Sequence, residues 1–174
     1  KYPYYASKKG STLVVPFTAE ETLLVRAEAE IIKKQYDAAV TDLNTWTAAY
    51  LNTTKNTFTK DEIIAFYKAL DYNSATAPTM KKKLNPSFTL DGGEDQEMLL
   101  HHLLQCRRVA TAHEGLRWFD IRRYGIEVYR FVHDTKDRAK VTVAKTLSSW
   151  DEHTTFQIPQ NVRNAGLEPT PRTK

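Results

Sequence analysis

The feature that most constrains the fold is a pair of predicted helices separated by only two residues, Gln35 and Tyr36. Thr18 and Glu21 form a capping box: the hydroxyl accepts a hydrogen bond from the Glu21 amide and the carboxylate reaches back, which predicts a helix over 18–34. Apolar residues at helical spacing then predict a second helix over 37–51. So short a linker makes the two helices antiparallel neighbours. The apolar stripes are Leu24, Ala27 and Ile31 in the first helix and Val40, Leu43, Thr47 and Tyr50 in the second, with Trp46 beside them.

The rest of the chain predicts three further helices, two strands and long loops. A second capping box, Thr59 with Glu62, begins a helix that ends near Leu70 and whose apolar stripe is Ile63, Phe66, Tyr67 and Leu70. Residues 72–93 contain Asn, Ser, Thr, Pro and Gly throughout and are predicted to form a long surface loop. The other expected elements are a long helix over 94–113, a short helix over 116–124, strands over 127–132 and 140–143, an extended segment over 156–159 and a polar tail from 161. The long helix has a predicted buried stripe of Leu99, Leu103, Cys106, Ala110 and His113, with Gly115 as its C-cap.

Length and composition fit a single globular domain over 1–174. Hydrophobic residues make up 41% and charged residues 26%, which argues against a wholly disordered chain. No apolar run approaches the ~20 residues that cross a bilayer. We divide the chain into an irregular lead-in over 1–17, a helical part over 18–125, and a hairpin, loops and tail over 126–174.

The charge pattern predicts no nucleic-acid partner. The net charge of +4 is mild, and the basic residues are spread along the sequence. The run Lys81-Lys82-Lys83 is interpreted as a solvated loop rather than as a phosphate groove. The single cysteine, Cys106, excludes an internal disulfide and a cysteine-based zinc cage.

Two groups of residues could hold a metal. His102, Cys106 and His113 lie on one predicted helix and carry the N and S ligands that zinc prefers, but no fourth ligand is evident and core packing is favoured. An acidic cluster flanks a pair of glycines, and its spacing misses the EF-hand pattern, so a solvated helix start is favoured. The cluster comprises Asp91, Glu94, Asp95 and Glu97. Neither a metal nor any other cofactor is predicted.

Glu114 and Asp120 could be proposed as the paired carboxylates of a glycoside hydrolase. They lie among Arg117, Arg122 and Arg123, and guanidinium pairing lowers the pKa of a carboxyl, which makes it a poor general acid. A structural ion-pair network is therefore the favoured interpretation, and no catalytic residue is predicted.

Three aromatic residues in or near predicted loops are candidates for stacking on sugar rings: Trp150, Tyr72 and Tyr50. Half-buried packing would explain each of them equally well.

Four segments, in order along the chain, resemble the SusD/RagB family of glycan-binding outer-membrane lipoproteins. Residues 17–29 (FTAEETLLVRAEA) resemble one family helix and residues 36–44 (YDAAVTDLN) the next, and this pair is similar to a tetratricopeptide hairpin. Residues 107–125 resemble a third segment through RRVA and HEGLRWFDIRRYG, and residues 156–160 (FQIPQ) resemble the terminal strand. Cys106 stands where the family usually has Glu, and Asn161 and Val162 stand where an acidic residue is common in its closing motif.

The resemblance implies an all-α (mainly) fold, with tetratricopeptide-like helix hairpins, long loops and a small β-hairpin. Family members are much longer, so the chain corresponds to their C-terminal portion, with the lipid-bearing cysteine and much of the sugar-binding surface upstream. The implied protein is surface-exposed at the cell outer membrane, anchored by that upstream lipid. It captures an oligosaccharide, or a peptide in some members, and passes it to a SusC-like TonB-dependent transporter without breaking a bond.

Few site residues carry over from the family, and those that match form a structural motif where the long helix turns into the short one. Trp118 and Phe119 are expected to pack back onto the long helix. Glu114 and Asp120 are expected to be partly buried and held by one or more of four arginines: Arg26, Arg117, Arg122 or Arg123. The motif residues are Arg26, Glu28, Glu114, Arg117, Trp118, Asp120 and Arg123. Two alternatives stay open: a tetratricopeptide-type scaffold that binds peptides or proteins, and, less favoured, a glycoside hydrolase fragment.

Overall fold

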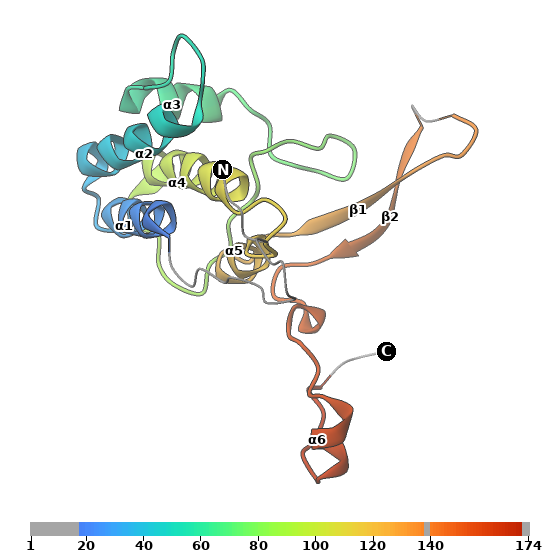
Figure 1. The fold of residues 1–174 in the computed structure, drawn as a ribbon. Coiled ribbons are helices and arrows are strands. Elements are labelled where there is room, and N and C mark those ends of the chain that lie inside the picture. Colours follow the sequence, from blue (N-terminus) through green and yellow to red (C-terminus); the bar gives the residue numbers. More distant parts are fainter. Residues whose placement is uncertain (1–17, 138–139, 172–174) are drawn as a thin grey trace, which may run out of the picture.

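The computed structural model describes residues 18–137 and 140–171 (Figure 1). The predicted irregular lead-in over 1–17 lies outside the described residues. Within them the chain is mainly helical with long loops and one small antiparallel hairpin, which confirms the predicted fold class. The elements are α1 (Ala19–Ile32), α2 (Tyr36–Tyr50), α3 (Lys60–Lys68), α4 (Gly93–Ala110), α5 (Arg117–Arg123), β1 (Val128–His133), β2 (Val141–Leu147), a 3-10 turn η1 (Glu152–Thr154) and α6 (Gln160–Asn164).

Both predicted capping boxes are confirmed. Thr18 Oγ1 accepts from the Glu21 amide at 3.1 Å, and the Thr18 amide donates to Glu21 Oε2 at 3.2 Å. The same reciprocal pair joins Thr59 and Glu62, at 3.2 and 2.9 Å. Because each box satisfies amides that the first helical turn leaves unpaired, it fixes where α1 and α3 begin.

Helices α1 and α2 form the predicted antiparallel pair. The turn between them is 33–35 rather than Gln35 and Tyr36, because Tyr36 is already the first residue of α2 and Lys34 takes a positive φ of 62°. Arg26 and Asp42, each eight residues from Lys34, form an ion pair at 2.6 Å, as an antiparallel hairpin requires. Small residues allow the close approach, since Ala27 and Ala39 are both fully buried.

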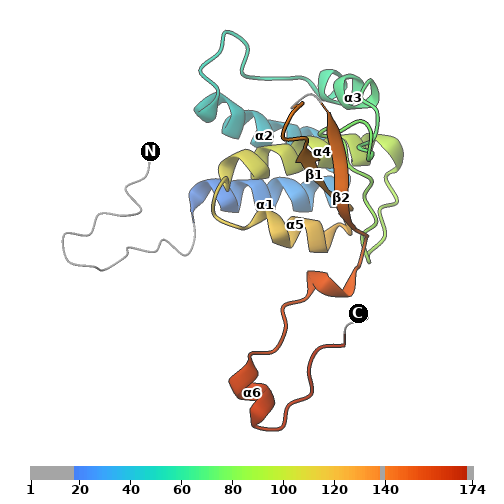
Figure 2. The same cartoon turned by 90° about the vertical axis from the view of Figure 1, so that its right-hand side faces the viewer.

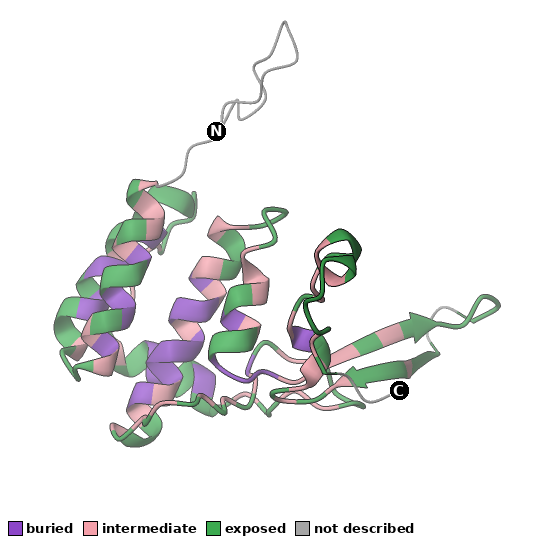
Figure 3. Cartoon of the chain, turned by 90° about the horizontal axis from the view of Figure 1, so that it is seen from below, coloured by how far each residue is buried: buried purple, intermediate pink, exposed green. Residues whose placement is uncertain are grey.

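Helix α4 is the centre of the molecule and contacts α1, α2, α3 and α5 (Figures 2 and 3). Its residues Leu99, Leu100 and Leu103 have no exposed surface. Gln96 fixes its start against α1, since its buried side-chain amide donates to the Ile31 carbonyl at 3.0 Å. The described helices therefore share one core, and α4 positions the elements around it.

The end of α4 differs from the prediction. The helix stops at Ala110, which is half-buried, and the predicted stripe continues only to Cys106. His113 is exposed at φ 69° and Gly115 has φ 78°, so both belong to the turn before α5. Gly115 is thus not the C-cap of α4; a turn from Thr111 onward was needed to bring α5 back against the core.

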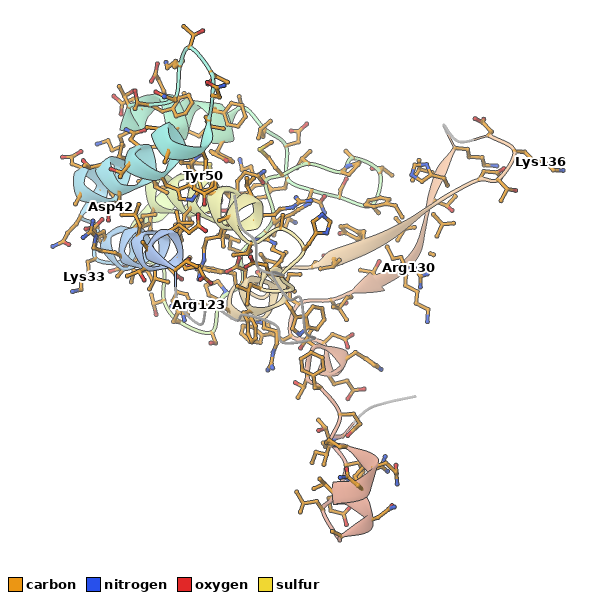
Figure 4. All side chains as sticks on the ribbon, viewed as in Figure 1. Lys33, Asp42, Tyr50, Arg123, Arg130 and Lys136 are labelled. Carbon is orange, nitrogen blue, oxygen red and sulfur yellow. The ribbon has the colours of Figure 1, made fainter. Side chains whose placement is uncertain are left out.

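The C-terminal part extends away from the helices (Figure 1). Strands β1 and β2 pair in antiparallel register with a bulge between Arg130 and Phe131, and β2 is longer than the predicted 140–143. Arg130 and the tip residue Lys136 are exposed on this hairpin (Figure 4). The short helix α6 was not predicted in the tail. A lone two-stranded hairpin has little core of its own, so it depends on the helices at its base.

Candidate functional site

The three aromatic candidates contact different parts of the molecule. Tyr50 closes α2 and stacks on Trp46, with ring centroids 4.5 Å apart (Figure 4). The Tyr72 hydroxyl donates to Glu97 Oε1 at 2.8 Å. Trp150 sits at φ 61° and donates from Nε1 to the Asn85 carbonyl at 2.8 Å. All three keep exposed surface, and the contacts of each are with a different neighbour: Trp46, Glu97 and Asn85.

The structural motif is centred on Glu28 of α1, which is 6% exposed. Its carboxylate accepts from Arg107 Nη1 at 2.7 Å, from Arg123 Nε at 2.8 Å and from the Tyr124 hydroxyl. Burial acts to raise the pKa of Glu28, but the Tyr124 hydrogen bond and the two guanidinium charges outweigh it and lower that pKa. We call Glu28, Arg107, Arg123 and Tyr124 the Glu28 brace, because it ties α1 to α4 and α5.

Asp120 extends the brace on the α5 side. It is 4% exposed and lies 3.4 Å from Arg117 Nη1 and 3.5 Å from Arg107 Nη1. Burial raises the pKa of Asp120 more than the charges of Arg107 and Arg117 lower it. The arginines lower this pKa as expected, but burial outweighs them, so the expected net lowering of the Asp120 pKa was wrong.

Other members of the predicted motif lie elsewhere. Arg26 pairs with Asp42 and does not hold Asp120 or Glu114. Glu114 is exposed in the turn before α5, outside the buried network. Phe119 is 64% exposed and does not pack back onto α4 as predicted. Trp118 is half-buried and contacts Phe156, with ring centroids 6.5 Å apart.

The four segments of the family resemblance contact one another through these residues. Arg26 and Asp42 join the first segment to the second. Glu28 joins the first to the third through Arg107 and Arg123. The Trp118–Phe156 contact joins the third segment to the fourth. The residue types that carry the resemblance thus belong to one connected structural network.

The structure does not assemble the candidate metal ligands. Cys106 Sγ lies 3.9 Å from His102 Nε2, whereas His113 is in the exposed turn after α4. Burial lowers the pKa of His102 to about 4 and raises the pKa of the Cys106 thiol to about 12, as expected for core groups. Over residues 18–137 and 140–171, no group of three potential ligands is positioned for a metal ion.

The acidic cluster is held by ion pairs and hydrogen bonds within the protein. Lys34 Nζ contacts Asp91 at 2.7 Å, and Lys68 Nζ contacts both Glu94 and Asp95, at 3.1 and 3.3 Å. The carboxylate of Glu97, the fourth member, accepts from Tyr72. These contacts join the start of α4 and the residues before it to the α1–α2 turn, to α3 and to the loop after α3, which gives the cluster a structural explanation.

A groove of about 470 Å³ between α2, α3 and α4 was not predicted. Its lining is mostly apolar and includes Leu51, Phe66, Met80 and Val109, each at least 37% exposed. The sequence pattern placed Phe66 in the core stripe of α3, but it is 52% exposed at the rim of this groove. The sequence carries no local signal for this, because the adjacent residues Ile63 and Ile64 of the same helix are both buried.

No helix among the described residues is long and apolar enough to cross a bilayer. Comparisons with protein-family models, with curated proteins and with solved structures found no match to this chain.

Proposed function

We propose that this chain is the C-terminal portion of a SusD-like protein that captures glycans at the outer-membrane surface without cleaving them. In this proposal it delivers the glycan to a SusC-like TonB-dependent transporter. The observation that carries the proposal is the contact network among the four resembling segments, in which Arg26–Asp42, Glu28–Arg107 and Trp118–Phe156 link them all. The residues that make these contacts are themselves residues of the four resembling segments.

The non-catalytic part of the proposal is supported by the state of the buried carboxylates. Glu28 is fully engaged by two guanidinium groups and a phenol, and Glu114 lies apart on the surface. The pair Glu114 and Asp120, suggested by the sequence for glycoside hydrolysis, is therefore not aimed into a shared cleft.

The test uses the full-length protein in its native outer membrane. A tagged copy should co-purify with a large TonB-dependent transporter, whereas an unrelated lipoprotein with the same tag should not. Incubation of the purified protein with an oligosaccharide panel should show binding without any new reducing end. Recovery of the protein alone from membranes, or the appearance of cleavage products, would contradict the proposal.

One observation favours the peptide-binding alternative. The apolar groove lined by Leu51, Phe66, Met80 and Val109 has the character of a helix-binding groove. Phe66→Ser at its rim separates the two functions: loss of a bound peptide would favour the scaffold, while unchanged glycan capture would favour the SusD-like protein.

One observation also favours the hydrolase alternative. Asp120 has a raised pKa, as a general acid requires, and lines a pocket of about 250 Å³ together with Glu21. Glu21 is committed to the Thr18 capping box, so it is poorly placed to serve as the second carboxylate. A product assay with the Asp120→Asn variant tests this reading.

A further inference from the structure

The lysine run 81–83 is not the solvated loop that the sequence predicts. Lys81 is only 5% exposed, and its ammonium lies 4.4 Å from the centre of the Tyr72 ring. Lys82 is half-buried, and its ammonium donates to Asn73 Oδ1 at 2.6 Å and to the Thr79 carbonyl. Only Lys83 is exposed. Two of the three lysine side chains are therefore held in place by contacts within the protein.

Lys82 lines an open cleft of about 660 Å³ between the 71–92 loop, α4 and β1. Arg108, on the exposed side of α4, is the second cation of the lining. Neutral polar groups and apolar side chains make up the remainder. We call this site the cation cleft and define it by Lys82, Arg108, Asn73, Thr79, Gln105 and Phe131.

The two cations of the cleft have no counterion within it. Both acceptors of the Lys82 ammonium are neutral oxygens, and no carboxylate is part of the lining. Among the described residues Arg108 forms no ion pair, and residues 1–17 contain no Asp or Glu that could supply one. Burial, with the charges of Arg108 and Arg117, lowers the pKa of Lys82 to about 8. An anion in the cleft would relieve this repulsion.

The other residues that line the cleft indicate which chemical groups the rest of the ligand carries. The side-chain amide of Gln105 can donate to and accept from sugar hydroxyl groups, and the amide nitrogen of Asn73 can donate to them. The Thr79 hydroxyl already donates to the Asp71 carbonyl at 2.7 Å, so it can only accept from a ligand. Phe131 offers a flat apolar surface on which the face of a sugar ring can lie. A guanidinium beside an ammonium suits an oxyanion, because the fork of Arg108 can donate two parallel hydrogen bonds.

We infer that the cation cleft binds an anionic sugar unit, a uronate carboxylate or a sulfate ester, within an oligosaccharide. This inference rests on the proposed glycan capture and specifies the class of glycan. Because cations and hydrogen-bonding groups sit in one cleft, the site selects the acidic unit and leaves neutral sugars to the rest of the surface.

The experiment compares matched acidic and neutral probes by calorimetry or NMR titration at low salt. Trigalacturonate is paired with its trimethyl ester, and galactose 6-sulfate with galactose, so that the two sources of the anion are tested separately. We expect at least one acidic probe to bind about tenfold more tightly than its neutral partner, and added salt to reduce the difference.

Three variants test which residues cause the preference for acidic probes. Arg108→Gln changes an exposed helix residue and should remove the acidic preference without altering the fold. Lys82→Met should do the same, and circular dichroism checks that its loop anchor is not required for folding. Arg122→Gln removes another exposed arginine, from α5 and outside the cleft, and should keep the preference.

Equal binding of acidic and neutral probes, or no binding of either pair, overturns the inference. So does an acidic preference that survives Arg108→Gln. The proposed function is judged separately by transporter co-purification: if the transporter is recovered while the acidic preference is missing, only the inference fails. If both are missing, both proposals fail.

Discussion

Replacement of Glu28 by Ala gives the sharpest test of the Glu28 brace. It removes the acceptor of Arg107, Arg123 and the buried Tyr124 hydroxyl at once. Breaking a buried ion pair from one side costs about 3–5 kcal/mol. Arg123 is half-exposed and can be rehydrated, and Arg107 keeps a 3.5 Å contact with Asp120, so we take the lower end, about 3 kcal/mol. For a chain of this size that corresponds to a fall in Tm of roughly 6–12 °C.

Thermal and urea unfolding, followed by circular dichroism, measure this change. Glu114→Ala is the matched control, since it deletes an exposed glutamate in the turn before α5 and should stay within about 0.5 kcal/mol of the parent protein. A Glu28→Ala variant that unfolds with the parent midpoint would refute the brace. Equal losses from Glu28→Ala and Glu114→Ala would show that the effect does not come from the buried contacts.

The pKa shifts of Glu28 and Asp120 determine how their contributions to the free energy of unfolding change with pH. The pKa of Glu28 is lower in the folded protein than in the unfolded chain. Its contribution to stability is therefore fully present at a pH above its pKa in the unfolded chain, and it is lost as the pH falls through its pKa in the folded protein. Glu28→Gln should therefore cost more stability at pH 7 than in acid. The pKa of Asp120 is raised, so its contribution is present below the unfolded pKa and lost as the pH rises. Asp120→Asn should therefore cost less at pH 7 than in acid.

Three further predictions follow. Asp120→Ala should lower stability by about 2 kcal/mol, less than Glu28→Ala, because it leaves the half-buried Arg117 guanidinium without its carboxylate partner, while glycan capture by the folded full-length protein stays unchanged in a binding assay. Cys106 should react with a thiol reagent far more slowly in the folded protein than in urea, because it is 3% exposed and burial raises its pKa to about 12. This chain alone should bind neutral oligosaccharides weakly or not at all in calorimetry, because Trp150 and Tyr72 do not share a site; micromolar affinity would show that the site is local after all.

Features set by neighbouring residues were predictable from the sequence. The capping boxes of α1 and α3 depend on side chains three positions apart, and the α1–α2 hairpin follows from a very short linker. Those interactions form within one turn of chain, so the pattern of residue types is enough to specify them. The helical class of the fold follows from the same local signals.

Features set by distant contacts were not predictable in the same way. Glu28 meets Arg107 and Arg123 across 79 and 95 residues, and no local pattern states which arginine it binds. Lys81 is buried because Tyr72 covers its ammonium, which the run of three lysines does not reveal. The same reason applies to the three aromatic candidates. A loop position predicts that an aromatic side chain is exposed, whereas whether several of them share one site depends on how the loops pack.

Helix α4 shows how the stability network and the candidate ligand site are kept apart. Successive residues on a helix point about 100° away from each other, so the adjacent Arg107 and Arg108 can face different surroundings. Arg107 turns toward α1 and is committed to Glu28, whereas Arg108 turns outward and lines the cation cleft without a counterion among the described residues. The charge of Arg107 is neutralised inside the protein and cannot serve a ligand. The charge of Arg108 contributes little to the fold and can serve one. A loss of stability and a loss of anion binding should therefore separate between two neighbouring arginines of a single helical turn.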